Sequence, residues 1–224
     1  MDVENEKRET AERHKRQVTR YVLVVAVVSV FLVMSAVLIV YFVTTTANGE
    51  SQIAIISRAE WGARPPKSRA NMTSPVPYVI IHHSYEPDMC YNRSQCEEYV
   101  RGFQNFHMDT RGWDDIGYNF LVGGNGDVFE GRGWDVKGAH AGADWNGRSI
   151  GICFIGNFTD KLPPEEAITA GKMLIQLSIE RNKLMANYTL YGHRQVLLRT
   201  CPGNEFYKLI TEWKNWKPGN YTTT

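Results

Sequence analysis

The stretch "GYNFLVGGNGDVFEGRGW", residues 117–134, decides how the chain around it folds. Two strand-like runs flank Asn125 and Gly126, and an Asn-Gly pair between such runs is a strong signal for a β-hairpin. The glycines resemble a dinucleotide-binding fingerprint, but that motif must open a helix, and here a second strand follows. The stretch therefore predicts a hairpin within a sheet and excludes nucleotide binding at this position.

Buried strands are predicted on both sides of this hairpin. The apolar, β-branched runs "YVIIHHS", residues 78–84, and "SIGICFIGNF", residues 149–158, are typical of them. Apolar residues at helical spacing predict three helices, over residues 96–112, 163–183 and 204–216. The first of them ends at Gly112. Because strands and helices alternate loosely, we expect an α/β fold with a central mixed β-sheet flanked by about three helices.

A separate apolar run, "YVLVVAVVSVFLVMSAVLIVYFV", residues 21–43, predicts one transmembrane helix. It has no charged residue, proline or glycine, and it is long enough to cross a bilayer. A cleaved signal peptide is the alternative, but its apolar region usually has only ~7–15 residues. Six Lys or Arg side chains precede the run, and none follows it until Arg58. By the positive-inside rule, the N-terminus is cytoplasmic and the remainder lies outside.

This topology sets the expected domain organisation. We expect a cytoplasmic tail (1–20), a signal-anchor helix (21–43), a stalk (44–56), one folded domain (57–216) and a C-terminal tail (217–224), in a single-pass type II protein of the plasma membrane. Glycosylation sequons follow the span and none precedes it, which favours an extracellular domain: Asn71, Asn92, Asn157, Asn187 and Asn220. The net charge of +1 gives no indication of a nucleic-acid partner. The sequence does not predict an oligomeric state.

The cysteines divide into three kinds. Cys90 and Cys96 lie six residues apart in a polar loop, where a small disulfide loop forms easily. Cys153 lies among apolar strand residues and is most simply a buried thiol. Cys201, in "GHRQVLLRTCPG", residues 192–203, needs another explanation outside the cell: a partner thiol, a role as nucleophile, or a metal.

Histidines offer a choice between the last two roles. His82 and His83 end an apolar strand, and His193 lies in the same loop segment as Cys201. A catalytic zinc site takes three protein ligands from His, Cys and carboxylate and leaves the fourth position for water, so two histidines and a cysteine would suffice. From spacing alone, satisfied structural histidines remain the commoner case, and a Cys–His nucleophile pair fits about as well as a zinc site.

Several motifs, in order, resemble those of the peptidoglycan recognition proteins, which are relatives of the phage-type zinc amidases: "SRAEWGARPP", "YVIIHHS", "FHMDTRGWDDIGYNFLVGGNGDVFEGRGW", "GAHAG", "SIGICFIGNF" and "GHRQ…CPG". The resemblance covers about residues 57–216 and implies a central mixed sheet flanked by helices, the type 2 amidase fold. It implies Zn²⁺ ligands at His82, His193 and Cys201, and a catalytic tyrosine at Tyr118. Non-catalytic members typically have serine in place of Cys201.

The implied reaction is hydrolysis of the amide between N-acetylmuramic acid and the L-alanine of the peptidoglycan stem peptide, in innate immunity. Arg199 stands where amidase members often have threonine or lysine; its cation is expected to stabilise an oxyanion, or else to crowd the site. The resemblance also implies five residues that contact the substrate: Gly112, Trp113, Arg132, His83 and His140. Of these, Gly112, Trp113 and Arg132 imply a preference for diaminopimelate-type peptidoglycan. The alternative function is a non-catalytic, membrane-bound peptidoglycan receptor that signals on binding.

Overall fold

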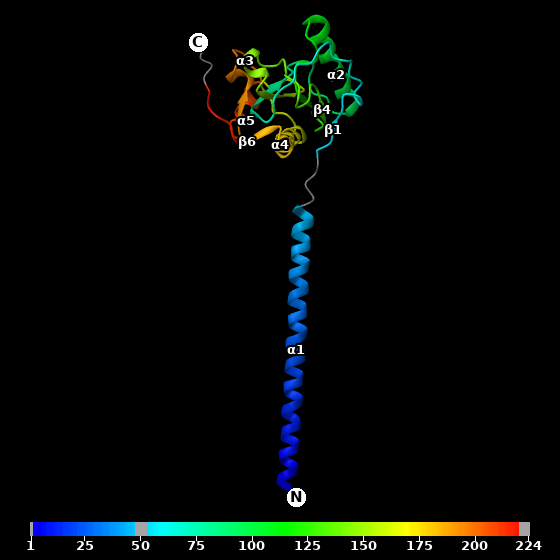
Figure 1. Ribbon diagram of the computed structural model, residues 1–224, viewed down its shortest axis with the longest axis vertical. Helices are drawn as coiled ribbons and strands as arrows, with labels where there is room; N and C mark the ends of the chain where they lie inside the picture. Colours follow the sequence, from blue (N-terminus) through cyan, green and yellow to red (C-terminus); the bar gives the residue numbers. More distant parts are fainter. Residues whose placement is uncertain (1, 48–52, 220–224) are drawn as a thin grey trace. The chain divides into compact units, whose positions relative to one another are not determined.

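The computed structural model describes residues 2–47 and 53–219, which form two compact units that divide after residue 52 (Figure 1). The first unit is one helix, α1 (Asp2–Ala47). Its Arg8–Tyr41 part contains an 18-residue stretch with a mean hydropathy of 3.1 and is long and apolar enough to cross a membrane. Most of the predicted span, residues 21–43, lies in this part, and all of it lies in α1. The helix is therefore a candidate signal anchor or signal peptide.

The second unit is built on a six-stranded mixed sheet, as predicted, with the strand order β1-β4-β3-β5-β2-β6. The strands are β1 (Ile55–Ile56), β2 (Val76–His83), β3 (Phe120–Val122), β4 (Val128–Glu130), β5 (Ser149–Phe154) and β6 (Leu184–Gly192). Among the six strands of the described residues, β3 and β4 are the antiparallel pair, and they form the hairpin predicted around Asn125 and Gly126. Gly126 has φ of +83°, a conformation that glycine adopts without strain in such a turn.

Helices cover both faces of the sheet (Figure 1). They are α2 (Arg93–Asn105), the short α3 (Ala143–Asn146), α4 (Glu165–Glu180) and α5 (Asn204–Ile210). One apolar core joins α4 and α5 to the sheet through residues such as Phe154 and Phe206, and a second joins α2 to the other face through Trp61 and Leu121. Every residue of β5 is buried, because this central strand has a packed layer on each face.

Several boundaries differ from the sequence predictions, and three of these differences change the architecture. Ile55 and Ile56, expected in the stalk, pair with β4 and belong to the sheet. The predicted helix over residues 204–216 ends at Ile210, because the chain after Trp213 leaves the helix and pairs with Leu190 of β6. The predicted helix over residues 96–112 is α2 followed by a separate π-helical turn, Phe106–Thr110. Strand β6 was not predicted.

The cysteines lie as the sequence indicated. Cys90 and Cys96 form a disulfide with an S–S distance of 2.05 Å, and Cys153 is a fully buried free thiol. Among the sequons, Asn71, Asn92 and Asn187 are exposed and Asn157 is half-buried, whereas Asn220 lies outside the described residues. Asn92 also caps α2, because its Oδ1 accepts the N–H of Gln95 at 3.0 Å.

Candidate metal centre

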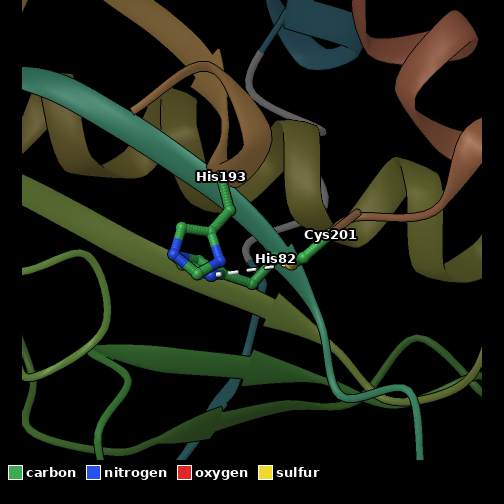
Figure 2. Close-up of side chains that lie close together, drawn as sticks. All are labelled: His82, His193 and Cys201. Atoms are coloured by element: carbon green, nitrogen blue, oxygen red, sulfur yellow. Dashed lines mark hydrogen bonds between the residues drawn. The ribbon is translucent and has the colours of Figure 1, made fainter. Parts of the chain in front are cut away.

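The parallel pairing of β2 with β6 brings the candidate ligands together. Ile81 stands opposite Gly192 in the register, so the next residues, His82 and His193, leave neighbouring strands at the same edge of the sheet. Their ring centroids are 4.4 Å apart. Cys201 reaches the same point from the loop before α5, and Figure 2 shows the three side chains converging.

The geometry of these three side chains fits a tetrahedral metal ion. One ligand atom from each lies within 4.8 Å of the others, and His82 Nδ1 is 3.8 Å from Cys201 Sγ. In a tetrahedral zinc site, Zn–N bonds of ~2.0 Å and Zn–S bonds of ~2.3 Å place the nitrogen and the sulfur ~3.6 Å apart. The distance from His82 Nδ1 to Cys201 Sγ is close to this value. Nε2 of His193 is buried and has no hydrogen-bond partner. The backbone N–H of His83 donates to Cys201 Sγ at 3.3 Å, which favours a thiolate.

The protonation states of the ligands distinguish metal binding from nucleophilic catalysis. Burial, followed by the nearby His193 and His140, lowers the pKa of His82 well below its usual value. Burial, followed by Arg199, lowers the pKa of His193 to about 4. Burial raises the pKa of the Cys201 thiol to about 12. A nucleophilic cysteine needs a lowered pKa, so these directions disfavour a Cys–His nucleophile pair. They are compatible with metal binding, which requires neutral imidazoles and a thiol that the cation can deprotonate.

A cavity of about 520 Å³ opens beside the candidate ligands. Tyr118 lies just before β3 and faces it, with its ring centroid 5.4 Å from that of His82. Burial raises the pKa of Tyr118 well above its usual value, so its hydroxyl remains a hydrogen-bond donor at neutral pH. The cavity thus combines a metal-binding set with a phenolic donor.

The comparisons with known proteins agree with this arrangement. Residues 72–204 match the family model described as N-acetylmuramoyl-L-alanine amidase. The chain is 42% identical over 180 residues to peptidoglycan-recognition protein SC2 of Drosophila melanogaster, covering 80% of this chain and 97% of that protein. It belongs to the peptidoglycan recognition protein family. The chain is also similar to the structure of wild-type Drosophila PGRP-LB, with 43% sequence identity and a TM-score of 0.74. The match covers 76% of this chain and 99% of that one. A PGRP-LB Y78F mutant in complex with tracheal cytotoxin is 41% identical, covers 75% of this chain and 100% of its own, and has a TM-score of 0.72.

Within this family fold, three of the predicted substrate contacts line the cavity: Trp113, His83 and His140. Trp113 stacks on His107, with ring centroids 4.7 Å apart and planes 19° apart. Gly117 permits this packing, because a Cβ there would come within 2.8 Å of the Trp113 ring. His83 is held from behind, since its Nδ1 accepts the N–H of Phe158 at 3.3 Å.

Two predicted contacts do not line the cavity in the described part of the chain, Gly112 and Arg132. Gly112 has φ of +70°, so its role in the structure is to turn the chain between the π-helical turn and Trp113. The Arg132 guanidinium donates to the backbone carbonyls of Ile116 at 2.7 Å, Lys137 at 2.8 Å and Asp115 at 3.5 Å. One N–H on each terminal nitrogen remains without a partner in this set.

Arg199, for which a catalytic role was predicted, lies at the cavity. Its side chain is exposed, lines the cavity and donates only to the neighbouring Leu198 carbonyl among the described hydrogen bonds. It is not in an ion pair with any described carboxylate. The guanidinium is therefore free to reorient toward an anion in the cavity.

Sequence analysis missed the contribution of the π-helical turn. A single helix was predicted over residues 96–112, but the turn directs the rings of His107 and the exposed Phe106 to the cavity wall. His107 Nδ1 accepts the N–H of Gly117 at 3.1 Å, so its proton is on Nε2. Arg111 lies over the Phe106 ring at 5.2 Å and also lines the cavity. Apolar spacing does not reveal the one extra residue that converts an α-helical turn into a π-helical turn.

Proposed function

We propose that this protein is a zinc-dependent N-acetylmuramoyl-L-alanine amidase that binds and cleaves bacterial peptidoglycan. The observation that carries the proposal is the convergence of His82, His193 and Cys201 at the wall of a cavity that Tyr118 also lines. Two imidazoles and a thiol with one open side match the three-ligand pattern of catalytic zinc sites. Relatives that bind tracheal cytotoxin, a peptidoglycan fragment, support the substrate class.

Each side chain has a defined part in this proposal. His82, His193 and Cys201 would hold the ion, and zinc, when bound, activates a water and polarises an amide carbonyl. The Tyr118 hydroxyl, protonated because its pKa is raised, donates a hydrogen bond to the oxyanion that develops on the substrate carbonyl. Arg199 brings a mobile cation to the mouth of the same cavity. The N–H of His83 stabilises the negative sulfur of Cys201.

The proposed preference is for diaminopimelate-type peptidoglycan. Diaminopimelate carries a carboxylate that a lysine-type stem lacks, and a guanidinium can bind a carboxylate through two N–H groups. Arg132 lies outside the described lining of the cavity, but backbone carbonyls orient it and leave one N–H on each of its terminal nitrogens for a carboxylate that extends beyond the cavity. A relative solved with monomeric diaminopimelic acid-type peptidoglycan supports this choice. We place the domain outside the plasma membrane in a type II topology, on the basis of the apolar α1 helix and its basic N-terminal flank.

The second candidate is a non-catalytic, membrane-bound receptor that signals on binding. Two observations favour it. The exposed cation of Arg199 at the cavity mouth can crowd the scissile amide. The apolar helix α1 can serve as the membrane anchor of a receptor. Both candidates use the same cavity, so binding of peptidoglycan does not distinguish them. Release of product does.

The test uses the full chain in detergent, with zinc added or removed by chelation. It is incubated with diaminopimelate-type muropeptide, and free stem peptide is measured by mass spectrometry. Zinc-dependent release that is lost in Cys201→Ser is the expected result. Cys153→Ser, at the other free cysteine, is the matched control and should leave zinc affinity unchanged. Tight binding without any release would overturn the amidase proposal and leave the receptor.

A further inference from the structure

The two ring nitrogens of His82 face different neighbours. Nδ1 lies 3.8 Å from Cys201 Sγ, on the side of the candidate metal. Nε2 lies 3.1 Å from Nδ1 of His140, in the interior of the domain. A neutral imidazole carries its proton on one nitrogen only. If the Nδ1 lone pair binds a metal, the proton must be on Nε2, which makes His82 the donor and His140 the acceptor.

His140 is held as rigidly as a residue with this role requires. Its side chain is 7% exposed, and its ring meets that of His82 edge-on, with centroids 5.0 Å apart and planes 85° apart. Two glycines make room for it, because a Cβ at Gly138 or Gly151 would come within 2.4 Å or 2.5 Å of the ring. The backbone N–H of His140 donates to Asn146 Oδ1 at 2.9 Å. Packing against these two glycines and this backbone hydrogen bond hold His140 beside His82.

The far side of the His140 ring is also informative. Its Nε2 is buried without a well-formed hydrogen bond. Buried polar atoms are nearly always paired, so an exception needs an explanation. The ring lies near the backbone of Ser149 on this side, and its side-chain partner is His82, which it meets through Nδ1. The buried ring therefore contributes one side-chain interaction, the hydrogen bond between its Nδ1 and His82 Nε2.

We propose that His140 is a positioning residue for the metal centre, not a contact for the substrate. Its Nδ1 accepts the Nε2–H of His82, fixes the Nδ1-binding tautomer and aims the ring at the ion; this inference rests on the zinc site proposed above. Metal-binding histidines usually donate their second N–H to a carboxylate, a backbone carbonyl or a water, and loss of that partner weakens metal binding. In this chain a second imidazole takes that position.

A pair of amide substitutions tests the proposal. The side-chain oxygen of Asn can occupy the position of a histidine Nδ1, whereas the longer Gln places its amide near the position of Nε2. His140→Asn should therefore keep a zinc affinity within ~3-fold of the parent, and His140→Gln should lose ~10–100-fold, the usual effect of removing such a partner. Zinc affinity is measured by competition with a chromogenic chelator, and the Co²⁺ absorption spectrum reports the ligand geometry.

Controls separate this inference from the proposed function. Thermal unfolding in EDTA shows whether both variants fold, and binding of chelator-treated protein to a diaminopimelate-type muropeptide shows whether His140 contacts substrate. If the two variants bind zinc equally well, or if both keep zinc but lose the muropeptide, His140 is not a positioning residue. If the parent protein itself binds no zinc, the metal site proposed above is wrong, and the inference fails with it.

Discussion

Arg132 allows the structural and the specificity roles of one side chain to be separated. Its guanidinium donates to the carbonyls of Ile116 at 2.7 Å and Lys137 at 2.8 Å, and a third contact at 3.5 Å contributes little. Hydrogen bonds from a charged donor contribute ~1.5–3 kcal/mol each, and partial exposure favours the lower end. Burial of the leucine side chain in Arg132→Leu offsets part of the loss. We expect the free energy of unfolding to fall by ~2–3 kcal/mol, which lowers Tm by ~5–10 °C for a domain of this size.

The same substitution should abolish the proposed preference between peptidoglycan types. A bidentate contact with the additional carboxylate of diaminopimelate is expected to contribute ~10-fold in affinity at a half-buried site. The affinities of Arg132→Leu for diaminopimelate-type and lysine-type muropeptides are measured by calorimetry, and their ratio should approach one. Arg69→Leu is the matched control, since Arg69 is exposed and has no described hydrogen bond or ion pair. If stability falls while the affinity ratio stays unchanged, Arg132 only joins backbone segments, and the specificity argument is wrong.

Two further predictions concern packing and pH. Gly117→Ala should lower the free energy of unfolding by ~1–3 kcal/mol, because the new Cβ would come within 2.8 Å of the Trp113 ring; muropeptide affinity should fall while zinc affinity is kept, and equal loss of both would contradict the reasoning. The metal-free protein should lose stability as the pH falls from 6.5 toward 4. Burial lowers the pKa to about 4 for His83, His107 and His193, and to about 3 for His140. Between 6.5 and these values the unfolded state binds protons that the folded state excludes, so stability drops by ~1.4 kcal/mol per histidine per pH unit. Urea unfolding in EDTA at pH 7.5, 6 and 5 measures it, and a flat profile would show that these rings are solvated.

The sequence predicted the hairpin, the buried strands and the mixed sheet because each has a local signal. Asn125-Gly126 between apolar runs specifies a turn, and continuous β-branched runs specify strands buried on both faces. The first half of β6 lacks such a signal, because Met185, Ala186 and Asn187 are all exposed, and burial alternates only from Tyr188 to Gly192. The place of β6 at the edge of the sheet, where Trp216 and its neighbours partly cover it, depends on long-range contacts that the pattern does not contain.

The site shows the same division between what is local and what is not. The motifs predicted different roles for the adjacent histidines, and the structure supplies the physical reason. Successive residues of a strand point to opposite faces, so His82 and His83 cannot both face the metal. His82 points toward His193 and His140, whereas the ring of His83 packs near Phe158 and the backbone of His83 contacts Cys201 Sγ. The strand pleat thus directs the His82 ring toward the candidate metal position and the His83 ring away from it, and that arrangement needed the register of β2 against β5 and β6.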